Sequence, residues 1–188
     1  MALQAAREIV REEGLAALTT RRATKAIGYT VGTLYQIFRD ADDLIEQMNA
    51  ETLDELHASC KQIDFDAGPA ASLRALAERY LAYVSENPRL WAAVLEYRPA
   101  NGHQRQELYL ASVRRLMSLI EAAIDPFFEP NAERIRLHEA RVLWASFYGI
   151  SALSSERLLS KEESAAAMVE TLIEIYVSSR GQTQKHRG

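Results

Sequence analysis

Residues 28–38 have the sequence Gly28-Tyr29-Thr30-Val31-Gly32-Thr33-Leu34-Tyr35-Gln36-Ile37-Phe38. Glycine favours a turn, and a threonine such as Thr30 can begin a helix by accepting a backbone N–H bond. Leu34 and Phe38 lie four positions apart, so both can face a core. A glycine within a helix costs roughly 1 kcal/mol relative to alanine. One reason for Gly32 is therefore the close approach of another backbone.

The segment before this stretch predicts a second short helix. Thr19 is a plausible cap for a helix over residues 20–26, which carries Arg21, Arg22 and Lys25. A helix, a glycine turn and a helix are the order of a helix-turn-helix motif. A short helix with small, polar and aromatic outward residues suits insertion into a DNA major groove.

The pattern of residues 18–45 resembles the DNA-binding domain of the TetR (tetracycline repressor) family. The resemblance is carried by Leu18-Thr19-Thr20-Arg21-Arg22, Gly28, Thr33-Leu34-Tyr35, Phe38 and Asp40-Ala41-Asp42-Asp43-Leu44-Ile45. It extends in register over about residues 3–57. It implies a transcriptional regulator, most simply a repressor, that acts as a homodimer on a palindromic operator. We expect a helix-turn-helix DNA-binding domain over 1–45 and a helical effector-binding and dimerisation domain over 46–188.

The composition is that of a globular protein that binds no membrane. The chain has 188 residues, of which 48% are apolar and 26% charged. It has no apolar run near the roughly 18 residues of a membrane span, and its start does not resemble a signal peptide. Cys60 is the only cysteine, so no intramolecular disulfide can form. These features predict a cytoplasmic protein.

The charge is distributed unevenly along the chain. Residues 1–39 hold six basic and three acidic side chains, a charge of +3, whereas the whole chain carries −4. The remainder therefore carries −7. A mildly basic head on an acidic body is expected of a DNA-binding module attached to a regulatory domain.

The apolar spacing predicts an all-α fold of about nine helices. Besides the two helices of the motif, about 20–26 and 31–38, helices are predicted over about 3–13, from 41 to a break at 64–68, and over 69–86, 88–97, 104–124 and 132–158, with a last one from about 160. Ser160 and Glu163 predict a capping box for the last helix, and residues 182–188 are predicted to be a loose tail. Helix 132–158 is apolar over most of its circumference, so it should meet both its own core and a partner subunit. The family resemblance implies that this helix and the last one form the dimer interface.

Each residue type in the motif suggests a role on double-stranded DNA. Arg21 can bind guanine or a phosphate, whereas Thr20, Thr33 and Tyr35 suit phosphate contacts. Tyr29 and Gln36 are candidates for base edges, and Val31 for a thymine methyl group. The predicted DNA-binding residues are Thr20, Arg21, Tyr29, Thr30, Val31, Gly32, Thr33, Tyr35 and Gln36.

Some positions depart from the family pattern and motivate an alternative. The family often has lysine where this chain has Val31 and Ala41, and Asp42 and Asp43 lie beside the second position. The alternative is a helical ligand-sensing or protein-interaction dimer whose head no longer binds DNA well. Salt dependence separates the two hypotheses, because DNA binding releases counterions.

The C-terminal part predicts a pocket for a small, mainly apolar effector. Aromatic side chains with polar tips suit a cavity that orients a ligand, although core packing is the simpler interpretation of any single one. The predicted lining is Trp91, Tyr97, Tyr109, Met117, Trp144, Phe147 and Tyr148. Residues 90–97 and 144–149 also resemble the regulatory domain class named for a Trp-His-Gly signature, with Tyr148 in place of histidine.

The sequence predicts neither an enzyme nor a cofactor. It contains no Gly-rich phosphate loop, Gly-x-Ser-x-Gly, His-Glu-x-x-His or paired Glu-x-x-His element. His57, His103 and His138 lack the spacing of metal ligands, so no metal site is expected. Cys60 lies on an apolar stripe and is expected to be buried and inert.

Overall fold

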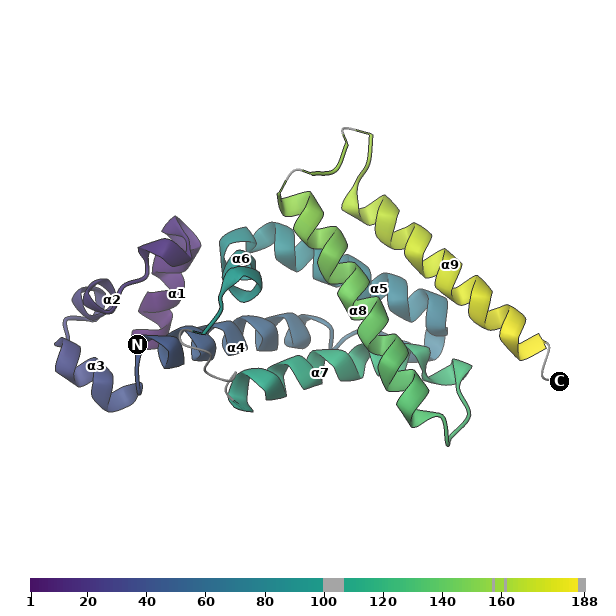
Figure 1. Cartoon of the computed structure of the whole chain (residues 1–188), viewed down its shortest axis with the longest axis horizontal. Helices are drawn as coiled ribbons and strands as arrows, with labels where there is room; N and C mark the ends of the chain where they lie inside the picture. The colour runs from purple at the N-terminus through teal and green to yellow at the C-terminus, as the bar shows by residue number, and fades with distance from the viewer. Residues whose placement is uncertain (100–106, 157, 161, 186–188) are drawn as a thin grey trace. The chain divides into compact units, whose positions relative to one another are not determined.

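The computed structural model describes residues 1–99, 107–156, 158–160 and 162–185 of the chain (Figure 1). Within these ranges the secondary structure is helical, with nine α-helices and short 3-10 turns, which confirms the predicted fold class. The chain divides into two compact units. Unit 1 comprises residues 1–55 and 85–114, and unit 2 comprises 56–84 and 115–188.

Unit 1 holds the predicted helix-turn-helix. Its helices are α1 (Ala2–Glu13), α2 (Thr20–Ile27), α3 (Val31–Ile37), most of α4 (Ala41–Ser59), α6 (Pro88–Glu96) and the first part of α7 (Glu107–Ile124). The sequence placed the helix boundaries in this unit within two residues where they can be compared. The predicted start of the seventh helix at Gln104 lies outside the described residues.

The core of unit 1 joins α6 to the three N-terminal helices. Ala6 and Val10 from α1, Leu34 from α3, Met48 from α4 and Leu90 from α6 pack in one buried cluster. The Arg89 guanidinium at the start of α6 also donates to the carbonyl oxygens of Arg11 and Glu12, where α1 ends. The predicted DNA-binding domain over 1–45 therefore shares its core with a helix that comes more than forty residues later.

A buried cation links α1 to α4 within the same unit. The Arg7 side chain is 1% exposed, and its guanidinium donates to Thr52 Oγ1 at 3.1 Å and to Glu55 Oε2 at 2.5 Å. Glu51 lies farther away, at 3.8 Å. Partial burial raises the pKa of the Glu51 carboxyl although Arg7 lowers it. Glu55 is therefore the principal partner of Arg7.

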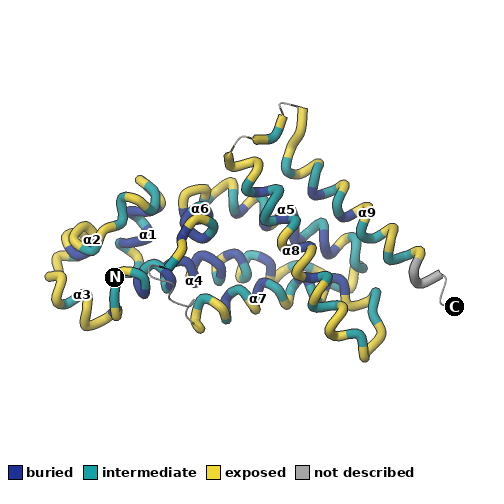
Figure 2. Tube along the Cα trace, in the orientation of Figure 1, coloured by how far each residue is buried: buried dark blue, intermediate teal, exposed yellow. Residues whose placement is uncertain are grey.

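Unit 2 is built on the end of α4, most of α5 (Pro69–Glu86), the second part of α7, α8 (Glu133–Ser155) and α9 (Ala165–Lys185). Leu56, Leu73, Leu116, Leu143 and Ile173 are buried there. Helices α8 and α9 lie side by side, with one buried stripe each and mixed exposure elsewhere (Figures 1 and 2). No helix in the described part of the chain is long and apolar enough to span a membrane.

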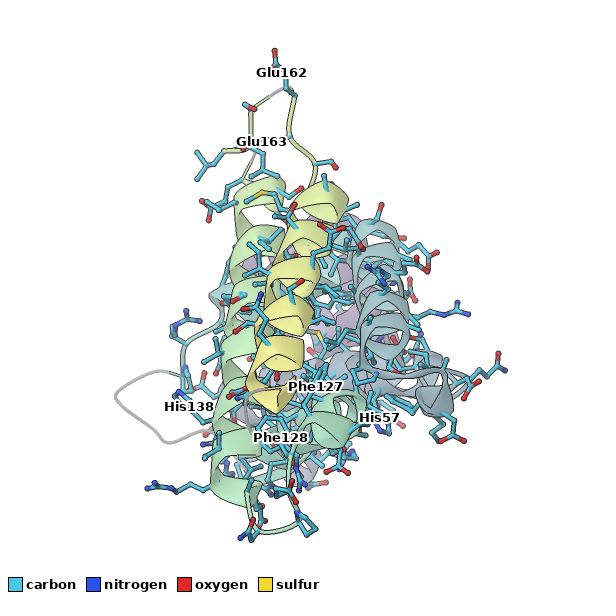
Figure 3. The ribbon with its side chains drawn as sticks, turned by 90° about the vertical axis from the view of Figure 1, so that its right-hand side faces the viewer. His57, Phe127, Phe128, His138, Glu162 and Glu163 are labelled. Atoms are coloured by element: carbon cyan, nitrogen blue, oxygen red, sulfur yellow. The ribbon has the colours of Figure 1, made fainter. Side chains whose placement is uncertain are left out.

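Polar contacts fix the pairing of α8 with α9 near the C-terminal half of α9. Glu139 accepts from the Tyr176 hydroxyl at 2.8 Å and from Arg180 Nε at 2.7 Å. Burial raises the pKa of Tyr176 to about 12, so its phenol stays protonated and donates. Phe127 stacks edge-on against Tyr176, and Arg180 lies 4.6 Å from the ring centre of Phe128 (Figure 3).

The last helix corrects two sequence predictions. Helix α9 begins at Ala165, and Ser164 Oγ accepts the first-turn N–H of Ala167 at 3.1 Å. Glu163 Oε2 does accept the Ser160 N–H, but this bond lies before the helix, so the pair is not its capping box. Helix α9 also continues through Gly181 to Lys185, so residues 182–185 are helical and not a loose tail, while residues 186–188 of that prediction lie outside the described residues. A helix tolerates an interior glycine at a cost of about 1 kcal/mol.

Candidate nucleic-acid interface

Local side-chain chemistry builds the turn between α2 and α3. The Thr19 hydroxyl caps α2 by accepting the Arg22 N–H at 3.2 Å. Gly28 ends α2 with φ 71° and ψ 22°, a left-handed conformation that glycine adopts without steric cost. The Tyr29 N–H then bonds the Thr24 carbonyl at 3.0 Å. These bonds turn the chain sharply, and only three residues, 28–30, separate α2 from α3.

Helix α3 is anchored by its cap and by one buried side chain. Thr30 Oγ1 accepts the Thr33 N–H at 3.2 Å and lies 3.0 Å from the Thr33 hydroxyl oxygen. The Thr30 hydroxyl is therefore used to begin the helix. Leu34 is buried in the core of unit 1 and Phe38 follows it, as predicted, so the rest of the helix surface is left for a partner.

The faces of α3 follow from its one buried residue. Successive helical residues turn by about 100°, so Gly32 and Gln36 each lie about 20° from the point opposite Leu34. Tyr35 and Thr33 lie about 80° from this centre on opposite sides, and Val31 and Ile37 lie about 120° from it, nearer to Leu34. The exposed apolar side chains of the segment are Tyr29 (39% exposed), Val31 (41%), Tyr35 (48%) and Ile37 (55%). Ile37 was not among the predicted DNA-binding residues.

Gly32 has no internal reason to be glycine. Its φ is not positive, and a Cβ atom there would find only Thr30 Oγ1 within 4 Å, at 3.8 Å. The conformation and the space would both accept alanine, which is the better helix former. Nothing in the described chain therefore requires glycine here, and the missing Cβ leaves this face open to close approach by a bound partner.

Two cations beside α3 carry no carboxylate partner in the described residues. Arg21 and Lys25 are exposed, four positions apart on α2, and Thr20 lies half-buried at its start. By contrast, Arg22 pairs with Glu13, and Arg39 Nε lies 3.9 Å from Asp43 Oδ2. Arg21 and Lys25 are thus the side chains most available to phosphates.

Asp43 is turned away from the surface that would meet DNA. Its carboxylate accepts the Arg39 N–H at 2.8 Å and the Gln47 side-chain amide at 2.8 Å, and its side chain is 9% exposed. The Asp43 N–H is itself capped by Asp40 Oδ1 at 2.8 Å. The residue therefore has a structural use at the start of α4, which weakens one motive for a head unable to bind DNA.

Comparison with known families identifies the architecture. A model described as "Bacterial regulatory proteins, tetR family" matches residues 2–48, and one described as "Tetracyclin repressor-like, C-terminal domain" matches residues 73–176. The chain belongs to the TetR family. It is a transcriptional regulator that binds DNA through its helix-turn-helix, and not an enzyme. The C-terminal description names no Trp-His-Gly domain, so that resemblance stays a prediction.

Solved structures agree on the fold of this TetR-family regulator. A TetR transcriptional regulator from Rhodococcus sp. RHA1 is 19% identical with a TM-score of 0.65, covering 93% of this chain and 92% of that one. FadR from Bacillus subtilis in complex with stearoyl-CoA is 14% identical with a TM-score of 0.65, over 94% and 96%. A protein of unknown function from Rhodococcus sp. RHA1 is 17% identical with a TM-score of 0.71, over 93% and 91%. Curated proteins give no match.

Unit 2 of the TetR-family chain contains a small, partly open apolar cavity. Its volume is about 30 Å³, and its lining carries no charged side chain. The residues around it are Leu56, Cys60, Leu76, Tyr80, Leu116, Leu119, Ile120, Trp144 and Phe147. Tyr80 and Trp144 meet edge to face, with ring centres 6.1 Å apart.

The predicted ligand residues are divided between the two units. Trp144 and Phe147 line the cavity in unit 2, whereas Trp91, Tyr97 and Tyr109 belong to unit 1, where Trp91 and Tyr97 are buried. Met117 and Tyr148 lie half-buried in unit 2 but not on this cavity. The roles of these residues in ligand binding stay a prediction. The aliphatic lining was missed because leucine and isoleucine at helical spacing look the same in any core.

The remaining candidate groups show no metal chemistry in the described residues. No cluster of three metal-ligating side chains occurs there, and His103 lies outside them. Cys60 is buried as predicted, and burial raises the pKa of its thiol. A protonated, buried thiol is a poor nucleophile.

Proposed function

We propose that this TetR-family regulator is a repressor that binds an inverted-repeat operator as a homodimer and releases it when a small apolar effector binds. The observation that carries the proposal is a capped, exposed α3 beside two cations, Arg21 and Lys25, that have no carboxylate partner among the described residues. Repression is favoured by the tetracyclin-repressor-like description of the C-terminal domain. Since DNA lies in the cytoplasm of bacteria, we place the regulator there.

Helices α8 and α9 are the proposed dimer interface. Both carry large apolar side chains that are exposed in the single chain, among them Ile135, Val142 and Leu153 on α8 and Ile175 on α9. A two-fold dimer buries the same patch on both subunits. It would also present two α3 helices to successive major grooves, with half-sites about 34–36 Å apart.

The direct test is selection of bound sequences from a random duplex pool with the full-length protein at near-physiological salt. We expect an inverted repeat whose half-sites are centred about 10–10.5 base pairs apart or a multiple of that. Recovery of no sequence from a folded dimer, with a co-purified effector excluded, would favour the protein-interaction alternative.

Salt dependence gives the first prediction. Two available cations in each subunit give about four phosphate contacts in a dimer, so log K against log salt should have a slope of about −3.6. Affinity should then fall about a hundred-fold between 50 and 200 mM salt, measured by fluorescence anisotropy on the selected operator. Arg21→Gln should make the slope about two units shallower, because each subunit loses one contact. A slope near −7 would mean that Arg22 and Arg39 leave their carboxylates for phosphates.

The proposed effector is neutral and binds in the cavity of unit 2. The lining has no charge to balance a carboxylate or phosphate, and a buried charge without a partner is strongly disfavoured. A volume of about 30 Å³ is far below the roughly 150 Å³ of a cavity that holds benzene. A ligand must therefore widen the cavity. It favours the widened conformation only if it binds that conformation more tightly than the narrow one.

Expansion of this cavity would act on α4. Leu56 of α4 lines the cavity, and Thr52 and Glu55 of the same helix hold Arg7 of α1. A shift of α4 at Leu56 would therefore strain the contact that positions the helix-turn-helix. This route couples the ligand to DNA affinity through one continuous helix.

Probe molecules give the second prediction. Toluene should raise the melting temperature, and at ten times its Kd it should stabilise the protein by about 1.4 kcal/mol, or roughly 3–5 °C. Benzoate, which adds a carboxylate to the same ring, should have no effect. Cys60→Met should abolish the toluene shift by filling the cavity. An equal shift with benzoate, or an unchanged toluene shift in the variant, would contradict the assignment.

A further inference from the structure

The exposed surface of α3 carries three large apolar side chains and no cation of its own. Residues 31–37 contain no lysine or arginine. Their exposed side chains include Val31, Tyr35 and Ile37, and Tyr29 directly precedes the helix. Packing within the chain does not require these exposed side chains to be apolar, because Leu34 already anchors α3 in the core of unit 1.

The exposed apolar side chains lie on both flanks of α3. By the same rotation of about 100°, Tyr35 lies about 80° from the centre of the outward face, and Val31 and Ile37 lie about 120° from it on opposite sides. Val31 is the first residue of α3. In a helix-turn-helix the N-terminal residues of the recognition helix contact base edges. Val31 is therefore the apolar side chain of α3 best placed to reach the bases.

The major groove offers one apolar group, the 5-methyl of thymine. A valine side chain carries only methyl groups at its tip, and burial of apolar surface is its one means of recognition. The other bases present no methyl group in the major groove, so this contact selects thymine. Gly32, the next residue, has no Cβ atom, so the Val31 side chain and the thymine methyl group can approach closely.

We propose that Val31 recognises the methyl group of one thymine in each operator half-site, with the Tyr35 ring covering the contact. Operator specificity then rests on an apolar contact beside the bases that Gln36 can reach, and not on a cation in α3. This inference rests on the proposed operator function, since it names a base within that operator.

The test removes the methyl group and nothing else. Each thymine of the selected operator is replaced in turn by deoxyuridine, which keeps the base pair, and the Kd of the full-length protein is measured by anisotropy. At one position in each half-site we expect binding to weaken about four-fold, and about sixteen-fold when both are replaced. Other thymines should show changes below two-fold.

Two matched variants assign the effect to a side chain. Val31→Ala should bind the thymine and deoxyuridine operators equally, whereas Ile37→Ala, an aliphatic truncation on the other side of α3, should keep the full difference. Both side chains are exposed, so thermal melts should show that both variants fold. If Val31→Ala binds too weakly to titrate, Val31→Thr, which keeps one methyl group, should show a reduced difference.

Two results would overturn the inference alone: an operator insensitive to deoxyuridine at every thymine, or a Val31→Ala or Val31→Thr variant with an undiminished deoxyuridine effect. A random pool that returns no sequence would instead overturn the operator function, and this inference with it.

Discussion

Gly32→Ala is expected to make the protein more stable and its operator binding about ten- to a hundred-fold weaker. The stability gain follows from helix propensity, because alanine is favoured over glycine by up to about 1 kcal/mol. Nothing inside the chain opposes the added Cβ, whose nearest neighbour would be Thr30 Oγ1 at 3.8 Å. The loss of affinity corresponds to about 1.4–2.8 kcal/mol, comparable to one bidentate base contact.

The loss has a geometric cause. Gly32 lies near the centre of the face opposite Leu34, so a methyl group there would hold α3 away from the groove floor. Contacts of Val31 and Gln36 with bases would lengthen together. Thermal melts and anisotropy titrations of the same preparation measure the two effects. Misfolding cannot explain a variant that melts at a higher temperature and yet binds the operator more weakly.

Gly181→Ala is the matched control. Gly181 also lies within a helix, α9, with no atom near its missing Cβ, and it is far from the helix-turn-helix in the sequence. Because α9 belongs to the proposed dimer interface, the dimeric state of this variant is checked first; the dimeric variant should gain stability with unchanged operator affinity. Full operator binding by Gly32→Ala would show that no close approach to DNA occurs at this glycine.

The helix-turn-helix was predictable because short-range chemistry determines it. Thr19 and Thr30 cap helices through bonds to N–H groups three residues ahead, and Gly28 adopts the conformation that ends α2. No distant part of the chain competes for these groups. The boundaries of α2 and α3 therefore followed from the sequence within one residue.

Features that depend on choices between neighbouring residues were less predictable. Asp42 and Asp43 look alike in the sequence, but only Asp43 bonds the Arg39 N–H and the Gln47 amide and is turned inward. Similarly, Ser160 and Ser164 both suit the start of a helix, and Ser164 caps α9. Sequence spacing gives the candidates, and the path of the loop selects between them.

The ligand cavity was the least predictable part because it depends on which helices meet. The sequence shows that residues 88–97 form an amphipathic helix, but not that α6 packs with α1 in unit 1. Trp91 and Tyr97 were therefore assigned to the same pocket as Trp144, which lies in unit 2. The aliphatic residues that line the cavity carry no chemical signal of their own.

Neutralising the carboxylates around Arg7 is expected to destabilise the protein more than removing Arg7 itself. In Glu51→Gln/Glu55→Gln the guanidinium stays buried, at 1% exposure, but loses both counter-charges. Breaking a buried ion pair from one side costs about 3–5 kcal/mol. The half-exposed carboxylates place the cost near the lower end of this range, or a decrease of roughly 6–12 °C in melting temperature.

Removing Arg7 instead of its carboxylate partners leaves no buried charge at this contact. In Arg7→Met an unbranched apolar side chain fills the space, and Glu51 and Glu55 keep side-chain exposures of 48% and 51% in which water can solvate them. Thr52 keeps its bond to the Met48 carbonyl at 3.1 Å. Replacing a buried ion by an apolar side chain of similar size is often close to neutral. We therefore expect a small change in the free energy of unfolding, measured by urea titration.

The single variants separate the two carboxylates. Glu55→Gln should cost more than Glu51→Gln, because Glu55 Oε2 lies 2.5 Å from the guanidinium and Glu51 Oε2 lies 3.8 Å away. If Arg7→Met proved as damaging as the double glutamine variant, the contact would act through the shape and hydrogen bonds of arginine and not through charge. In that case α1 would be held on α4 chiefly by the bonds of Arg7 to Thr52 and the Met48 carbonyl.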